Sequence, residues 1–309
     1  MKGYERMKYI RKFLDFVEIN TKIASVFPFL VGAGYVLYRY GSLKPEQTLV
    51  FFAAMLLFDM TTTAINNHIG HRQTGRVPHY PKAVSVAIIF AMGLSAAALG
   101  LYLVSISGTV ILLAGMICFA VGVTYSYGFI PITRTPFGEI LSGVVMGFFI
   151  PFIVVQINNP LINIAFYDFS RVVITVNWME LLALGVVVIP LVCCIANIML
   201  ANNICDVEED TRVKRYTLPF YIGVEKALLL HRLIYIKAYL FIVVAVALRI
   251  VPVFTLALLV TCVPVKKNVT RFMALQDKKR TFFTAILNFL LIVAPYAAFV
   301  WLGGLLSIG

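Results

Sequence analysis

The feature that most constrains this chain is a series of long apolar segments separated by short polar ones. A helix that crosses a bilayer needs about 20 predominantly apolar residues, because its backbone groups must be hydrogen-bonded within the segment. Nine runs approach that length and predict nine transmembrane helices, at residues 23–38, 48–65, 83–104, 109–126, 138–156, 179–201, 233–248, 250–265 and 282–305. Only 13% of the residues are charged, against about 25% in globular proteins. We therefore expect an all-α integral membrane protein and exclude a soluble enzyme, a disordered chain and a fibrous protein.

The distribution of basic residues predicts how these helices are oriented. Lys and Arg concentrate in the cytoplasmic loops of membrane proteins. With the N-terminus inside, 21 of the 26 basic residues fall in inside segments and 4 in outside segments. This predicts a multi-pass protein of the cell membrane with its N-terminus in and its C-terminus out. The net charge of +12 follows from the same bias and suits anionic lipid. Because no long polar stretch could form a solvated basic domain, we do not expect nucleic-acid binding.

The polar segments suggest one domain, a single transmembrane unit over residues 1–309. Residues 1–22 are basic but lead into no cleavable apolar run, so they predict a retained segment at the membrane interface. Residues 66–82 and 202–232 are expected to be cytoplasmic loops. The five cysteines lie in or beside apolar runs and form no CxxC pair, which argues against a disulfide framework or a cysteine metal site. The sequence gives no indication of the oligomeric state.

Two of the predicted helices end alike. The second ends in Asn66-Asn67 and the sixth in Asn202-Asn203, and a polar, basic segment follows each pair on the same face of the membrane. This similarity favours two related halves around a central cavity that opens to the cytoplasmic side. Each half would carry a polar site at the end of its second helix.

The second Asn pair opens the most informative polar segment of the chain. If the helix continues past residue 201, Asn203, Asp206 and Asp210 share one face. Carboxylates at this spacing attract one another only through a shared cation, and hard oxygen ligands suit Mg²⁺, which usually completes its shell with water and substrate phosphate. Lys214 and Arg215, one turn further on, are placed to hold the same phosphate. A solvated loop of paired charges is the alternative, and the position at a membrane exit favours the functional interpretation.

The segment after the first Asn pair lacks these acids. Aligning the two pairs places Gly70 where the second half has Asp206, so the first site is neutral to basic. Asp59, two turns deeper, is placed either to bond a nearby threonine cluster or to reach a metal. His68 and His71 have the spacing of a transition-metal pair, but packed or solvated histidines are the more frequent outcome.

Two further segments carry candidate polar contacts. The loop from Tyr125 to Glu139 has prolines and glycines that break helix, so the fifth helix should start near Gly138. Glu139 then suits the positive end of that helix, and Arg134 is placed to hold an anion there. Before the first helix, Lys22 is either a snorkelling anchor or a phosphate contact.

The chain resembles the UbiA superfamily of intramembrane prenyltransferases, and within it the 1,4-dihydroxy-2-naphthoate polyprenyltransferase branch. The family has nine helices with the N-terminus inside and an Asp-rich motif at the ends of helices 2 and 6. The resemblance covers nearly the whole chain and is most specific at the second motif, Asn202-Asn203-x-x-Asp206-x-x-x-Asp210, followed by Thr217-Leu218. The family's opening and its connection between helices 4 and 5 are similar to Thr21-Lys22 with Pro28 and Gly32, and to the Tyr125–Glu139 loop.

The resemblance implies a transfer reaction. Mg²⁺ bound by the two motifs would hold the diphosphate of a polyprenyl donor, whose ionisation gives an allylic cation that an aromatic ring attacks. The acceptor implied is 1,4-dihydroxy-2-naphthoate, and the product is a demethylmenaquinone-type quinone of menaquinone biosynthesis. The implied metal ligands are Asp206 and Asp210, with Asn203 and Asn67 as weaker ones. Other implied site residues are Asn202, Lys214 and Arg215 for catalysis and Lys22, Asn66, Asn67, Tyr125, Arg134 and Glu139 for substrate binding.

The first motif departs from the family pattern. The family has Asn-Asp-x-x-Asp, whereas this chain has Asn66-Asn67-His68-Ile69-Gly70. At the second motif, Cys205 and Lys214 replace a common Arg and a common Gly. A neutral first site predicts weaker Mg²⁺ binding there.

These departures leave several readings open. In the first, one metal is enough for catalysis. In the second, the donor diphosphate recruits the metal. In the third, the protein is a non-catalytic relative that binds a prenyl lipid or quinone. Besides an active prenyltransferase and a non-catalytic binding protein, a secondary transporter is a further class of function. Most acids are expected at the cytoplasmic rim of the membrane, whereas coupling sites of transporters lie near its midplane, which argues against a transporter.

Overall fold

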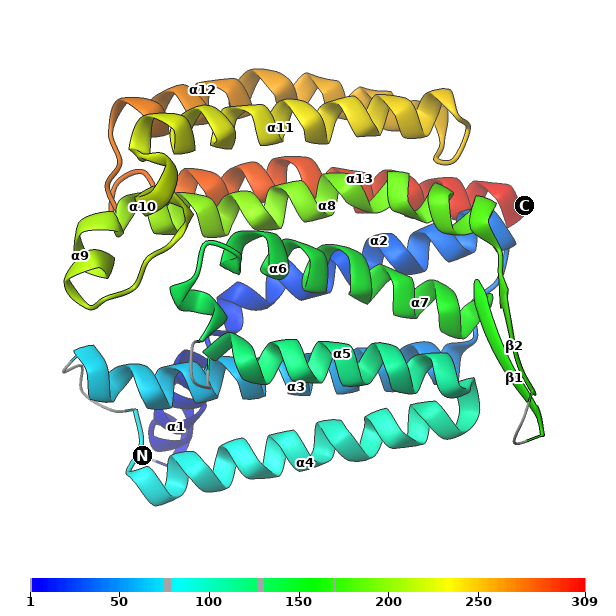
Figure 1. Ribbon diagram of the computed structural model, residues 1–309, viewed down its shortest axis with the longest axis horizontal. Helices are drawn as coiled ribbons and strands as arrows, with labels where there is room; N and C mark the ends of the chain where they lie inside the picture. The colour runs from blue at the N-terminus through cyan, green and yellow to red at the C-terminus, as the bar shows by residue number, and fades with distance from the viewer. Residues whose placement is uncertain (1, 75–78, 127–130, 169–170, 309) are drawn as a thin grey trace.

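The computed structural model describes residues 2–74, 79–126, 131–168 and 171–308. It is a bundle of long helices that run side by side, with one β-hairpin at an end (Figure 1). The α-helices are α1 (Lys2–Phe16), α2 (Ile23–Tyr40), α3 (Pro45–Thr74), α4 (Lys82–Ser107), α5 (Thr109–Ser126), α6 (Gly138–Val144), α7 (Ile150–Asn158), α8 (Trp178–Cys205), α9 (Val207–Arg212), α10 (Leu218–Ile222), α11 (Val224–Ala247), α12 (Cys262–Ala274) and α13 (Phe283–Ile308). Short 3₁₀ segments, η1 (Ile19–Lys22), η2 (Ile132–Arg134) and η4 (Val253–Thr261), and a π-helical turn, η3 (Val145–Phe149), join them.

Every predicted apolar run is helical over most of its length. Among the described residues, eight helical segments are long and apolar enough to cross a membrane, and α5 is a shorter apolar helix beside them. Three of the eight are composite, because η1 precedes α2, η3 joins α6 to α7, and η4 precedes α12. The tight reversal between α4 and α5 falls at Gly108, whose φ of 91° favours glycine. Nine crossings, and their orientation, stay predictions.

The two segments expected to be loops are largely helical, so those boundaries were wrong. α3 continues through Asn66 and Asn67 to Thr74, and α11 begins at Val224 rather than at residue 233. Apolar character marks the part of a helix that suits lipid, whereas a helix ends where its backbone hydrogen bonding ends. α11 starts directly after Gly223, a residue with φ of 82°. Residues 75–78 of the first expected loop lie outside the described residues, as does the side chain of His71. Residues 127–130 of the Tyr125–Glu139 segment also lie outside them.

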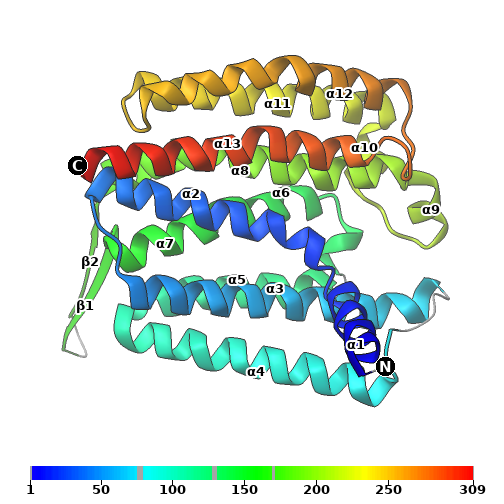
Figure 2. The same cartoon turned by 180° about the vertical axis from the view of Figure 1, so that it is seen from behind.

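A β-hairpin that the sequence analysis did not predict joins α7 to α8. β1 (Ile162–Asp168) pairs antiparallel with β2 (Arg171–Val176), with Ile162 opposite Val176. The hairpin lies across one end of the bundle, beside the ends of α5 and α7 (Figures 1 and 2). Gln156 of α7 fixes its start, because its side-chain oxygen accepts hydrogen bonds from the backbone N–H of Leu161 at 2.9 Å and of Ile162 at 3.0 Å. The alternating Ile and Val residues were the available signal.

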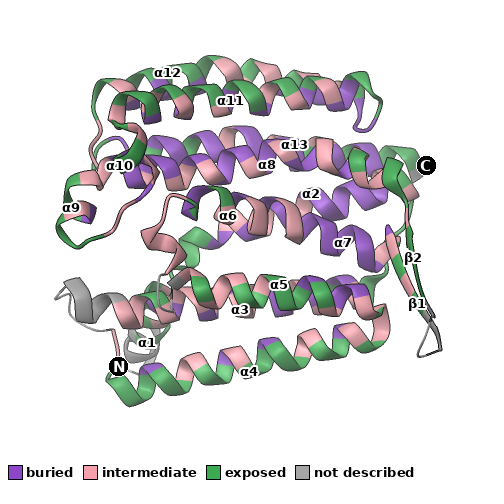
Figure 3. Cartoon of the chain, in the orientation of Figure 1, coloured by how far each residue is buried: buried purple, intermediate pink, exposed green. Residues whose placement is uncertain are grey.

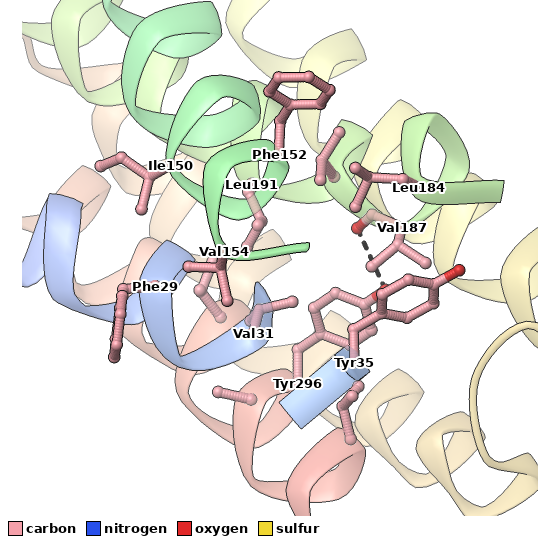
Figure 4. Close-up of a cluster of buried hydrophobic side chains, with 14 of the residues drawn as sticks. Phe29, Val31, Tyr35, Ile150, Phe152, Val154, Leu184, Val187, Leu191 and Tyr296 are labelled. Atoms are coloured by element: carbon pink, nitrogen blue, oxygen red, sulfur yellow. Dashed lines mark hydrogen bonds between the residues drawn. The ribbon is translucent and has the colours of Figure 1, made fainter. Parts of the chain in front are cut away.

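The packed centre of the bundle consists of α2, α7, α8 and α13, whereas α4, α11 and α12 expose much of their surface at the periphery (Figure 3). The core includes Tyr296, whose hydroxyl donates to the backbone oxygen of Val187 at 3.1 Å (Figure 4). Gly143 and Gly147, four residues apart, bring α6 and η3 against α8. A Cβ at Gly147 would lie 2.6 Å from the backbone nitrogen of Val192. This close small-residue contact fixes α8, which carries the second motif, against α6, which carries Glu139.

Candidate active site

A cavity of about 1620 Å³ extends along the inner faces of α3, α4, α5, η3, α7 and α8. One part of the cavity is lined by apolar side chains, among them Met55, Leu103 and Ile111. At the other end, the cavity reaches the carboxyl-terminal parts of α3 and α8, where Asn66, Asn67 and Asn202 contribute to its wall. The expected central cavity between the two motifs is therefore present, and the side on which it opens stays a prediction.

The structure brings most of the predicted site residues to this cavity. Those that line it are Asp59, Asn66, Asn67, Tyr125, Arg134, Asn202, Asp206, Asp210 and Arg215. Four others are not part of its wall, namely Lys22, Glu139, Asn203 and Lys214. These four residues contact residues of the cavity wall or lie next to them in the chain.

Asp206 lies where α8 ends, and it contacts a basic residue from a distant loop. Its Oδ2 accepts a short hydrogen bond from Nζ of Lys278, which also donates to Oδ1 of Asn202 at 2.7 Å. The side chain of Asp206 is 16% exposed and that of Lys278 is 47% exposed. The two acceptors thus converge on a positive charge at the mouth of the cavity, which is the arrangement that binds a cation.

Asp210 lies one turn further, in α9, and its side chain is only partly satisfied. Its Oδ1 is 3.4 Å from Nη1 of Arg215, whereas its buried Oδ2 has no hydrogen-bond partner. Burial raises the pKa of Asp210 to about 6, against the opposing effect of Arg215. A buried carboxylate oxygen without a partner is costly, and a bound divalent cation would remove that cost.

Arg215 connects the second motif to the segment before α6. Its Nε donates to the backbone oxygen of Thr133 at 2.8 Å, and its Nη2 donates to Oδ1 of Asn203 at 3.3 Å. Between the same two segments, the backbone N–H of Tyr216 donates to the backbone oxygen of Arg134 at 3.3 Å. The α9 turn and the η2 turn are therefore held together on one wall of the cavity.

Asn203 does not share a face with Asp206 and Asp210, so that expectation was wrong. The α-helix stops at Cys205, Asp206 has φ of −102°, and α9 starts again at Val207 in a new direction. Asn203 instead donates from Nδ2 to Oε1 of Glu139 at 2.8 Å, away from the cavity. Asn202, four residues before Asp206, takes the cavity-facing place.

The end of the first motif helix is organised around an internal ion pair. Lys22 donates to Oδ1 of Asp59 at 2.7 Å and to Oγ1 of Thr63 at 2.6 Å, and Oδ2 of Asp59 accepts from Oγ of Ser25 at 2.6 Å. The side chains of Lys22 and Asp59 are 4% and 10% exposed. Both carboxylate oxygens of Asp59 are thus occupied by side chains of the protein.

Asn67 and Tyr125 contact neighbouring elements at the cavity wall. Nδ2 of Asn67 donates to the backbone oxygen of Phe16 at 3.0 Å, which ties the end of α1 to α3. The hydroxyl of Tyr125 lies 3.9 Å from the sulfur of Met199 in α8. Lys214 is exposed and has φ of 58°. This left-handed backbone favours glycine, so Lys214 adopts a strained conformation.

The sequence analysis missed charged residues that reach the cavity from elsewhere. Lys278 and Lys279 come from the loop between α12 and α13, and Asp15 and Glu18 come from the N-terminal segment. The available signal was the basic run at residues 278–280. Its long sequence separation from the motifs hid the contact.

Within the described part of the chain, no three His, Cys, Asp or Glu side chains converge into a preformed metal cage. Mg²⁺ does not require one, because it commonly binds through one or two carboxylates plus substrate phosphate. The carboxylates of Asp206 and Asp210, the latter with an unpartnered buried oxygen, are ligands of that kind. The residues present therefore fit a Mg²⁺ ion bound together with a phosphate ligand.

Comparison with known proteins agrees with this fold. Residues 25–292 match the model of the UbiA prenyltransferase family. The chain belongs to this family, and it is a multi-pass membrane protein. The chain is 30% identical over 163 residues to a 1,4-dihydroxy-2-naphthoate octaprenyltransferase of Bacillus subtilis (strain 168). That match covers 53% of this chain and 46%, about half, of the length of the relative.

Two solved structures share the fold at low sequence identity. One is a digeranylgeranylglyceryl phosphate synthase, with a TM-score of 0.67 and 12% identity over 95% of this chain and 99% of that one. The other is a UbiA homologue from Archaeoglobus fulgidus bound to GPP and Mg²⁺, with a TM-score of 0.54 and 14% identity over 96% of this chain and 99% of that one.

Proposed function

We propose that this protein transfers a polyprenyl group from a prenyl diphosphate to an aromatic acceptor, in the cell membrane and on its cytoplasmic side. The proposed acceptor is 1,4-dihydroxy-2-naphthoate, and the product is the prenylated quinol that precedes a demethylmenaquinone-type quinone. Membership of the UbiA family and the similarity to a naphthoate octaprenyltransferase support the reaction class. The UbiA homologue bound to GPP and Mg²⁺ supports a prenyl diphosphate as donor.

One observation carries the proposal. A single cavity joins a charged end, with Asp206, Asp210 and Arg215, to a long apolar interior formed by α3, α4 and α5. A polyprenyl diphosphate has the same division, with a charged head and a long apolar tail. The match of charge and length favours this donor over a small polar substrate.

The residues of the charged end have separate roles in this proposal. Asp206 and Asp210 hold Mg²⁺, with Asn202 as a neutral neighbour, and Arg134 and Arg215 lie on the same wall as anion partners. When bound, the metal neutralises charge that develops on the departing diphosphate. Arg215 positions Asp210 and donates positive charge in a site partly shielded from water. Asn203 and Glu139 support Arg215 and α6 from behind the wall.

The apolar part of the cavity protects the reaction. The allylic carbon–oxygen bond breaks, and its electron pair leaves on the diphosphate. A ring carbon then forms the new carbon–carbon bond and loses a proton, or carbon dioxide if it carries a carboxylate. Because the α3, α4 and α5 walls exclude water, the allylic cation meets the aromatic ring rather than a hydroxyl group.

The test is an assay of purified protein in lipid with 1,4-dihydroxy-2-naphthoate and an all-trans prenyl diphosphate, with and without Mg²⁺, followed by mass spectrometry of the product. Magnesium-dependent prenylated product supports the proposal. Tight Mg²⁺-dependent diphosphate binding without product would indicate a different acceptor or a binding protein. The absence of both diphosphate binding and product would contradict the proposal and favour a transporter.

A further inference from the structure

The loop between α12 and α13 places Lys278 on the second motif without being part of it. Nζ of Lys278 contacts Oδ2 of Asp206 and donates to Oδ1 of Asn202 at 2.7 Å. It also lies 5.7 Å from the ring centroid of Phe282, which is another residue of the cavity wall. A lysine from 72 residues further along the chain therefore occupies the mouth of the charged end.

The backbone of this loop is held in place, so the position of Lys278 does not depend on its ion pair alone. Oδ1 of Asp277 accepts hydrogen bonds from the backbone N–H of Lys279 at 2.9 Å and of Arg280 at 2.7 Å. Buried Thr281 accepts from the N–H of Asp277 at 2.9 Å and donates to the oxygen of Leu275 at 2.7 Å. These bonds fix the turn that starts α13 and project Lys278 toward Asp206.

The stability of the fold does not account for this contact. An ion pair with a partner that is 47% exposed contributes little free energy of folding, because solvent screens it. The position of Lys278 at the charged end of the cavity suits it to bind an anion instead. The first motif has no acid from Asn66 to Gly70, and Asp59 is already neutralised by Lys22. The positive charge that a metal held by first-motif acids would bring is thus missing on that side.

We propose that Lys278 binds the donor diphosphate and supplies this charge, so that the site works with one Mg²⁺ ion, held by Asp206 and Asp210. In the free protein, Lys278 contacts Asp206; when metal and diphosphate bind, it transfers to a phosphate oxygen. A charge-assisted hydrogen bond to phosphate is stronger than one to a neutral group. This inference rests on the proposed function, because it assumes a diphosphate in this cavity.

The experiment uses the full chain in lipid nanodiscs, with Mn²⁺ as the metal probe and inorganic pyrophosphate as the anion probe. Electron paramagnetic resonance counts bound Mn²⁺, and calorimetry gives the affinity for pyrophosphate in the presence of metal. The variants are Lys278→Ala and Lys278→Arg. The matched control is Arg280→Ala, which removes a cation of the same loop that is exposed and outside the cavity wall.

The affinities for the two probes are expected to respond differently to the loss of Lys278. Lys278→Ala should weaken pyrophosphate binding by about tenfold and leave the affinity for Mn²⁺ alone unchanged or higher, because Lys278 no longer competes for Asp206. Lys278→Arg should restore most of the pyrophosphate affinity, and Arg280→Ala should match the wild type. The wild type should bind one Mn²⁺ per chain with pyrophosphate. A thermal unfolding curve like that of the wild type shows that Lys278→Ala folds.

Two results would overturn the inference while leaving the proposed function intact. One is pyrophosphate affinity in Lys278→Ala equal to that of the wild type. The other is two Mn²⁺ ions per wild-type chain, with one lost in Asp15→Ala or Glu18→Ala, which would assign the missing charge to a second metal at the N-terminal segment. If the wild type binds no metal with pyrophosphate, and Asp206→Ala behaves identically, the proposed function fails and this inference fails with it.

Discussion

The helices α3 and α8 each carry an Asn pair with at least one member at the same cavity, yet the acids nearest to the two pairs are used differently. In α3, both carboxylate oxygens of Asp59 accept hydrogen bonds from side chains of the protein, one from Lys22 and one from Ser25. Near the end of α8, Asp210 has an unpartnered oxygen, and Asp206 faces only the exposed amine of Lys278. The difference shows that acidic residues at a cavity are not equivalent. An acid whose oxygens are already bonded supports the fold, and one with free oxygens can bind a ligand.

The largest effect is expected at the α8 end. Asp206→Ala and Asp210→Ala should each abolish turnover, a loss of about a thousandfold, because they remove charge-stabilising groups at the reacting end. Product mass in the prenylation assay measures this loss. Glu208→Ala is the matched control, since Glu208 is an exposed acid of the same short helix and lies outside the cavity wall. Activity like that of the wild type in either Asp variant would disprove the metal assignment.

The α3 end should respond in stability rather than in metal binding. Lys22→Met or Asp59→Leu leaves a buried charge without its partner, which should cost about 3–5 kcal/mol in free energy of unfolding. The double variant should be more stable than either single one. Thermal unfolding in detergent measures both. The affinity of the folded variants for Mn²⁺ should stay within about twofold of that of the wild type, and a large decrease would make Asp59 a metal ligand.

Restoring an acid to the first motif should make the two ends more alike. Gly70 follows Asn67 by three residues, as Asp206 follows Asn203 in the second motif. Gly70→Asp should preserve the Mg²⁺ affinity or raise it by up to about tenfold, since it adds an oxygen ligand with charge. Gly70→Asn is the control of the same size without charge. Calorimetry with Mg²⁺ distinguishes them, and lower affinity in Gly70→Asp than in Gly70→Asn would contradict the parallel between the motifs.

The smallest effect concerns the backbone of the second motif. Lys214 has φ of 58°, and Lys214→Gly should raise the free energy of unfolding by about 1 kcal/mol or less, because glycine adopts this conformation without strain. Pyrophosphate affinity should change less than about threefold, since Lys214 is exposed and outside the cavity wall. Lys214→Ala should lose the same charge without the gain in stability. A tenfold weaker affinity in both variants would make Lys214 a direct phosphate contact.

The class of fold and most residues of the candidate site could be predicted from local sequence patterns. Apolar runs of bilayer length admit only helices, and each predicted run is helical over most of its length. The Asn and Asp residues of the second motif, with Arg215 and Arg134, were identified because polar side chains at a membrane exit need a reason to be there. What apolarity did not indicate was where helices end, and so α3 and α11 extend beyond their predicted limits.

Which of these residues face one another depends on how distant helices pack. The break in α8 at Cys205 turns Asn203 toward Glu139 and leaves Asn202 beside Asp206. The pairing of Lys22 with Asp59, and of Lys278 with Asp206, joins residues that are 37 and 72 positions apart. Periodicity describes neighbours within a few turns of one helix. Contacts between distant helices depend on packing that no local pattern encodes.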